Sequence, residues 1–168
     1  MTSTLLPQLF ASSLIVGTSI ILHLVGLLLL LRMLQLHAGR VRTPHAVLNQ
    51  ALVIIAVGFG LFLLHALEIW LYAAFYIWVG EIRGLEDALY FSTSTYATIG
   101  YGDVLLSPRW RIFGAIEGAD GVILLGWSTA FFFSIIQRLR ALEHDWLTAA
   151  VRPRKRRRGL GAPPRSPE

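Results

Sequence analysis

Three long apolar stretches, separated by short charged segments, constrain this chain more than any other feature. Residues 1–31 contain no Asp, Glu, Lys or Arg. Residues 9–31 alone are long enough, at 1.5 Å per residue, to cross a hydrocarbon core of about 30 Å. Residues 51–79 and 112–136 form the second and third stretches, and 55% of the 168 residues are apolar. We therefore predict an all-α membrane protein with three transmembrane helices.

Several other classes of protein and site are excluded or disfavoured. A cleavable secretory signal is disfavoured, because no basic residue precedes the first apolar run and the run is longer than a signal core. Cysteine is absent, which excludes disulfides, thiolate zinc sites and cysteine nucleophiles. No catalytic Ser, His and Asp set or phosphate-binding loop is present, and no His pair or carboxylate set has convincing metal-ligand spacing. We expect no enzyme activity and no cofactor.

The distribution of basic residues predicts an orientation. Arg32, Arg40 and Arg42 follow the first stretch, and Arg138 and Arg140 follow the third. A second basic group lies near the C-terminus: Arg152, Arg154, Lys155, Arg156, Arg157 and Arg158. By the positive-inside rule these segments are cytoplasmic, which leaves the N-terminus and residues 80–111 outside. The C-terminal end of the second stretch is expected at a membrane surface, because its last half carries four amphipathic aromatic residues: Trp70, Tyr72, Tyr76 and Trp78.

The segment between the second and third stretches differs from an ordinary loop. Residues 85–110 are too polar to cross a bilayer and too apolar for a plain hydrophilic loop, which predicts a re-entrant segment shielded by protein. Glu86 and Asp87 favour a helix start, and residues 88–97 supply a short helix that dips inward. Its C-terminal end would direct partial negative charge toward the membrane centre, where a cation is stabilised. A glycine-containing strand, residues 98–102, is expected to follow.

Residues 91–103 read F-S-T-S-T-Y-A-T-I-G-Y-G-D and resemble the pore helix and selectivity filter of potassium channels. The filter of such channels is T-V-G-Y-G, so the only difference is an isoleucine for valine. The resemblance implies that backbone carbonyls replace the hydration shell of K⁺ in a filter of five residues: Thr98, Ile99, Gly100, Tyr101 and Gly102. Carbonyls can share one axis only if alternate residues adopt angles that are costly with a Cβ, which explains the two glycines.

Further site residues follow from the same resemblance. Asp103 would place a carboxylate at the outer mouth, and Ile99 and Tyr101 would pack behind the filter, Tyr101 bonding pore-helix aromatics through its hydroxyl. An ordinary glycine-rich turn is the alternative for the motif, and its position between two spans disfavours that alternative.

The third stretch is similar to a cavity-lining inner helix, with Gly121 as hinge or as packing glycine. Cavity and gate candidates at helical spacing are Val122, Leu125, Thr129 and Phe133.

Ionisable residues inside the predicted spans are functional candidates because burial makes them costly. His65 and Glu68 lie three apart on one helix, as do Glu117 and Asp120 on another. These four residues form either a pH-sensitive cluster or a structural network joining the helices, and we favour the structural network. His23 is interpreted as an interhelical hydrogen-bond partner, not a metal ligand.

Together these observations predict a potassium-selective channel subunit with passive conduction. The predicted regions are an N-terminal helix and cytoplasmic loop (1–47), a pore domain (48–140) and a basic cytoplasmic tail, partly disordered (141–168). One filter cannot surround an ion, and the resemblance implies a homotetramer.

The chain looks like a small bacterial ion-channel family with one pore loop per chain, which implies a multi-pass protein of a bacterial inner membrane. The tail is expected to bind anionic lipid, not nucleic acid. A less selective cation channel and a non-conducting membrane anchor or regulatory subunit are the alternatives.

Overall fold

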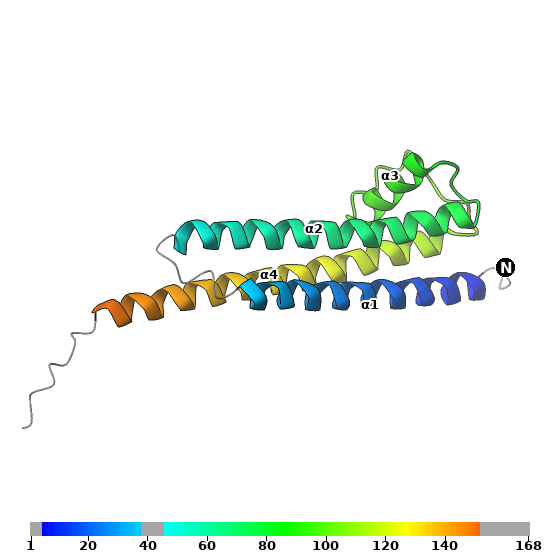
Figure 1. Ribbon diagram of the computed structural model, residues 1–168. Helices are drawn as coiled ribbons and strands as arrows, with labels where there is room; N and C mark the ends of the chain where they lie inside the picture. The colour runs from blue at the N-terminus through cyan, green and yellow to red at the C-terminus, as the bar shows by residue number, and fades with distance from the viewer. Residues whose placement is uncertain (1–4, 38–45, 152–168) are drawn as a thin grey trace, which may run out of the picture.

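Four helices make up the part of the chain that the computed structural model describes, residues 5–37 and 46–151. They are α1 (Leu5–His37), α2 (Ala46–Trp78), α3 (Leu85–Tyr96) and α4 (Arg111–Val151). The three long helices run side by side, and the short α3 lies near one end of α2 (Figure 1). No strand is assigned in the described residues. The all-helical prediction is therefore confirmed for this part of the chain.

Each long helix contains a segment long and apolar enough to cross a membrane, judged by length and composition alone. The segments are Leu5–Leu36, Leu48–Trp78 and Arg111–Leu139. They include the predicted stretches and, except at residue 79, extend past them, because the helices continue through polar residues at which the sequence prediction stopped. α4 also continues to Val151, so the predicted boundary at residue 140 is not the end of a helix. Arg40, Arg42 and the tail from residue 152 lie outside the described residues.

α1 and α2 pack closely because each places a glycine opposite a leucine of the other. A Cβ built on Gly26 would lie 2.4 Å from a methyl carbon of Leu64, and a Cβ on Gly60 would lie 2.4 Å from a methyl carbon of Leu30. Small residues allow transmembrane helices to approach and replace lipid contacts with van der Waals contacts between side chains. This reciprocal arrangement positions α1 beside the helix that carries His65 and Glu68.

An aromatic core joins the adjacent ends of α2 and α4. The rings of Phe75 and Phe113 stack with centroids 4.3 Å apart, and Tyr72 and Tyr76 contact Phe113 edge-on. Tyr72 and Tyr76 are 1% and 0% exposed. Their rings fill the interface between the helices, and their hydroxyls bond carboxylates of α4.

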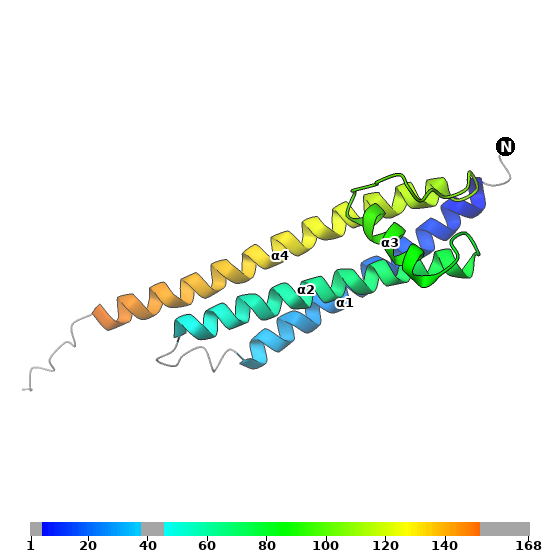
Figure 2. The ribbon, with the colours of Figure 1, turned by 90° about the horizontal axis from the view of Figure 1, so that it is seen from above.

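α3 lies between the ends of α2 and α4 and runs back along the bundle (Figure 2). It begins at Leu85 with Glu86 and Asp87 in its first turn, close to the predicted start. Its last residue, Tyr96, contacts Glu68 of α2 and lies against Gly121 of α4. Those two positions are each ten residues from the helix ends that flank α3, Trp78 and Arg111. At 1.5 Å per residue, the C-terminal end of α3 lies about 15 Å along the bundle.

Candidate functional site

The segment after α3 has an alternating backbone. Thr98, Gly100 and Gly102 have φ values of 59°, 58° and 79°, whereas Ile99 and Tyr101 do not have positive φ. Glycine adopts such angles without the steric cost that a Cβ adds, and Thr98 adopts one despite its β-branched side chain. Backbone angles that alternate in this way turn successive carbonyl groups toward the same side of the chain.

Ser94 of α3 anchors this segment. Its carbonyl accepts from the N–H groups of Ile99 at 2.8 Å and Gly100 at 3.1 Å, and its Oγ accepts from the N–H of Tyr101 at 3.4 Å. The predicted strand over residues 98–102 is wrong in this respect, because these N–H groups bond back to the helix instead of to a neighbouring strand. The segment is thereby fixed against the C-terminal turn of α3.

Asp103 is held by Tyr90, a residue that the sequence prediction did not single out. The Tyr90 hydroxyl donates to Asp103 Oδ2 at 2.7 Å, and the N–H of Val104 donates to Oδ1 at 3.0 Å. The Tyr90 bond holds the pKa of the exposed Asp103 carboxyl below its ordinary value, and the same bond raises the pKa of Tyr90. The ring of Tyr101 stacks on that of Tyr90, with centroids 6.2 Å apart. Tyr101 thus meets an aromatic residue of α3 through its ring face, whereas the sequence predicted a contact through its hydroxyl.

Replacing Tyr90 by phenylalanine is expected to raise the pKa of Asp103. The variant loses a hydrogen bond made to the charged carboxylate, so protonation becomes easier and the carboxylate charge is lost at a higher pH as the solution is acidified. Carboxyl ¹³C chemical shifts of protein labelled at aspartate, recorded during an acid titration, measure this directly. Leu105→Ala is the control, since that side chain is 80% exposed. An Asp103 titration that is the same in Tyr90→Phe and the parent would contradict the assigned cause.

Glu117 lies at the centre of a buried contact between α2, α3 and α4. Its Oε2 accepts from the Tyr76 hydroxyl at 2.5 Å, and its Oε1 accepts from the Ser92 hydroxyl at 2.5 Å. Glu117 and Ser92 are both fully buried. Glu117 thus faces protein within the third span, because a carboxylate facing lipid would have none of these partners.

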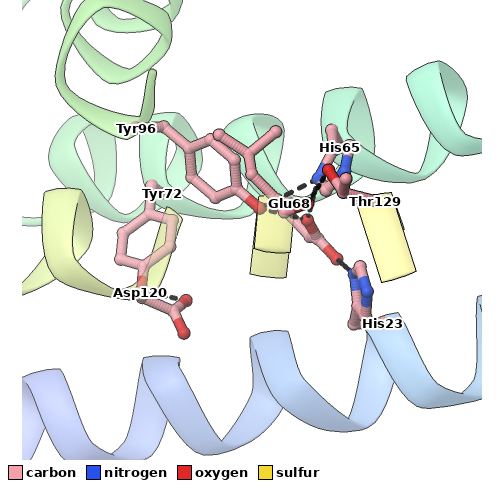
Figure 3. A network of polar contacts seen from close by, with 8 residues as sticks. His23, His65, Glu68, Tyr72, Tyr96, Asp120 and Thr129 are labelled. Atoms are coloured by element: carbon pink, nitrogen blue, oxygen red, sulfur yellow. Dashed lines mark hydrogen bonds and ion pairs between the residues drawn. The ribbon is translucent and has the colours of Figure 1, made fainter. Parts of the chain in front are cut away.

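Asp120 makes a separate contact one helical turn away. The hydroxyl of Tyr72 donates to Asp120 Oδ2 at 2.9 Å (Figure 3). Tyr72 and Tyr76 are four residues apart on α2, and Asp120 and Glu117 are three apart on the antiparallel α4. Matching spacing of hydroxyls and carboxylates was the signal in the sequence that would have paired the two helices.

His65 and Glu68 meet as their spacing predicts, and His23 joins them from α1 (Figure 3). Glu68 Oε1 lies 2.8 Å from His23 Nδ1, and Oε2 lies 2.9 Å from His65 Nδ1. The hydroxyl of Tyr96 donates to Glu68 Oε2 and lies 3.1 Å from His65 Nδ1. Three helices therefore converge on one carboxylate. Sequence reasoning assigned no function to His23, although His23 is the only ionisable side chain in residues 1–31.

The cavity and gate candidates occupy one exposed part of α4 in the single chain. Val122, Leu125 and Phe133 are 54%, 38% and 58% exposed, and the Thr129 hydroxyl donates to the Leu125 carbonyl at 2.8 Å. Gly121 is buried instead, and a Cβ there would lie 2.2 Å from the Tyr96 carbonyl oxygen. This contact supports the packing interpretation of Gly121.

Comparison with known proteins places these contacts in context. Residues 64–138 match a protein-family model described as ion channel. The match includes the C-terminal part of α2, all of α3, the alternating segment and α4 to Arg138, whereas α1 lies outside it. No curated protein and no solved structure matches the chain. The matched region and the three apolar helices support a membrane protein with an ion-channel function, which points to transport.

Proposed function

We propose that this chain is a subunit of a potassium-selective ion channel, with passive K⁺ conduction through a homotetrameric pore. The observation that carries the proposal is the alternating segment T-I-G-Y-G-D, residues 98–103, directly after α3 and inside the region that matches the ion-channel family. In potassium channels, rings of backbone carbonyls with this sequence pattern replace the hydration shell of the ion. Thr98 to Gly102 would provide those carbonyls, and no cofactor is needed.

The position of α3 supports its role as a re-entrant pore helix. Its acidic first turn lies near the flanking ends of α2 and α4, and Tyr96 lies about 15 Å along them, which is half the thickness of a hydrocarbon core. The C-terminal end of a helix carries partial negative charge. In the proposed pore this end faces the permeating cation, just below the filter.

The exposed side chains of the single chain support assembly into four copies. Ile99 and Tyr101 are 53% and 68% exposed, and Val122 and Phe133 on α4 are also exposed. One filter segment cannot enclose an ion, and closed rotational symmetry brings identical segments around one axis. In the proposed tetramer, Val122, Leu125, Thr129 and Phe133 line the cavity below the filter, and Asp103 lies at its outer mouth.

The proposed orientation places the N-terminus outside and the C-terminus in the cytoplasm of a bacterial cell. It follows from the basic residues after the first and third spans, of which Arg32 and Arg138 are among the described residues. The proposed partners are further copies of the chain and anionic lipid at the basic tail, since each such charge is attracted to an anionic leaflet by about 1 kcal/mol.

Reversal potentials of the purified protein in planar bilayers test the proposal. With a tenfold K⁺ gradient balanced by Na⁺, a potassium-selective pore is expected to reverse close to about 59 mV in magnitude, because only K⁺ sets the potential. Gly100→Ala is expected to abolish the current, since its φ of 58° disfavours a Cβ. Gly58→Ala, on α2 and away from the proposed cavity, is the matched control, because no atom lies within 4 Å of the added Cβ.

Each alternative function has a distinct outcome in the same recordings. Reversal near zero with robust current would indicate a less selective cation channel. Absence of current from folded, incorporated protein would indicate a non-conducting anchor or regulatory subunit. Current of unchanged selectivity in Gly100→Ala would contradict the assignment of residues 98–102 as the filter.

A further inference from the structure

The contact between α1 and α2 brings together three side chains of metal-binding type. One ligand atom from each of His23, His65 and Glu68 lies within 4.8 Å of the other two. His23 and Glu68 are fully buried, and the His65 side chain is 13% exposed. Spacing along the sequence did not indicate this set, because His23 comes from a different helix. Figure 3 shows the two histidines approaching the Glu68 carboxylate from different helices.

Each contact between a histidine Nδ1 and a Glu68 oxygen needs either a proton or a cation between the two atoms. Each Nδ1 is within 2.9 Å of a Glu68 oxygen, and a neutral imidazole that carries its proton on Nε2 would face that oxygen with a lone pair. A proton on each Nδ1 resolves this repulsion in the metal-free protein. A divalent cation among the three atoms resolves it equally well. We propose that His23, His65 and Glu68 form a binding site for a divalent transition-metal ion of the Zn²⁺ type.

The donor set and its dimensions suit such an ion. Two imidazole nitrogens and one carboxylate oxygen are preferred ligands of Zn²⁺, with bonds of about 2.0–2.1 Å, so tetrahedral ligand atoms lie about 3.3 Å apart. The observed separations are 2.8 Å from His23 Nδ1 to Oε1 and 2.9 Å from His65 Nδ1 to Oε2, and one ligand atom from each residue lies within 4.8 Å of the others. Binding an ion through one Glu68 oxygen therefore requires side-chain shifts of about 1 Å. The partial exposure of His65 supplies an access route. Tyr96 Oη lies 3.1 Å from His65 Nδ1, at the edge of this set of ligand atoms.

Metal binding at this site would change the contacts of Tyr96 and, through it, the position of the alternating segment. The Tyr96 hydroxyl donates to Glu68 Oε2, the group that the ion would engage, and Tyr96 is the last residue of α3 before the alternating segment. An ion would therefore compete with the bond that fixes this end of α3. The binding itself does not depend on the proposed potassium conduction, so the two can fail separately.

Co²⁺ is a suitable probe, because its visible absorption reports tetrahedral nitrogen and oxygen ligation. The background is full-length protein in detergent with the other histidines removed: His37→Gln, His45→Gln and His144→Gln. We expect saturable binding of one Co²⁺ per chain, displaced by Zn²⁺ and not by Mg²⁺. Adding His23→Gln or His65→Gln is expected to weaken binding at least about tenfold, the scale of loss seen when metal sites are perturbed. Ser134→Ala, on α4, is the matched control and should leave binding unchanged.

A spectroscopic measurement keeps the proposal falsifiable if a variant does not fold. Pulsed electron paramagnetic resonance of the Cu²⁺-loaded background protein counts coordinated imidazoles, and two are expected, one from α1 and one from α2. Fewer than two coupled imidazoles would overturn the site. So would the absence of saturable Co²⁺ binding, or equal binding in the folded His23→Gln and parent proteins.

Discussion

Replacing Gly121 by alanine is expected to lower the free energy of unfolding by about 3 kcal/mol, the upper end of the usual range for overpacking. The added Cβ would lie 2.2 Å from the Tyr96 carbonyl oxygen and 3.0 Å from the Tyr96 carbonyl carbon. Both are backbone atoms, so relief requires α4 to move away from the end of α3. The same displacement would disturb the alternating segment that begins two residues later, and we expect K⁺ current to be lost as well.

Unfolding of the detergent-solubilised protein by denaturant, followed by circular dichroism, measures the change for Gly121→Ala. Gly126→Ala is the control on the same helix, because its Cβ meets no atom within 4 Å. Alanine is favoured over glycine in helix interiors by about 0.5–1 kcal/mol, so this variant is expected to be neutral or slightly more stable. If the two variants unfold alike, α4 does not pack on α3 as described.

Replacing Glu117 by alanine is expected to be similarly destabilising, by about 2–5 kcal/mol. The substitution leaves the buried Tyr76 hydroxyl without its acceptor and creates a cavity, and a buried group without a partner costs about 1–3 kcal/mol by itself. The cost at Ser92 is smaller, because its hydroxyl also reaches the Ile69 carbonyl at 3.0 Å. Glu117→Gln keeps one oxygen acceptor, so about 1 kcal/mol is expected for it.

A double-mutant cycle isolates the contact between Glu117 and Tyr76. Tyr76→Phe removes the hydroxyl, so the combined Tyr76→Phe and Glu117→Ala protein should lose less stability than the sum of the two single variants. Glu86→Ala, an exposed change in the first turn of α3, is the control and should alter unfolding by less than about 1 kcal/mol. Strict additivity of the two substitutions would show that the two side chains do not interact.

The helices of this protein were predictable because the patterns that specify them are local. Apolar stretches long enough to span a bilayer predicted α1, α2 and α4, and Glu86 and Asp87 predicted the start of α3. The ends of the helices were less predictable, because polar residues at a helix end do not terminate it. α4 continues well past the charged residue Arg138 for this reason.

The buried polar contacts were only partly predictable, because they depend on which helix faces which. Spacing alone paired His65 with Glu68. The contribution of His23 depends on the glycine-to-leucine packing that aligns α1 with α2, and no local pattern contains that alignment. The sequence marked Tyr72 and Tyr76 only as aromatic residues near the end of a span. Their hydroxyls are buried because each buried carboxylate of α4 needs a donor, and that pairing depends on which face of α4 meets α2.

The length of α4 has a mechanical consequence. Its 41 residues make a rod of about 60 Å, twice the thickness of a hydrocarbon core, and it extends beyond α1 and α2 at its C-terminal end (Figures 1 and 2). Ile135 of α4 is buried in a cluster with Val57 and Leu61 of α2, so the helix is held well beyond its contacts with α3. The 16 residues after Ile135 make a lever arm of about 24 Å. A tilt of about 10° at Ile135 would displace the far end of α4 by about 4 Å, by the geometry of a straight helix. Small changes in the packing of α4 on α2 are thus enlarged at the other end of the molecule.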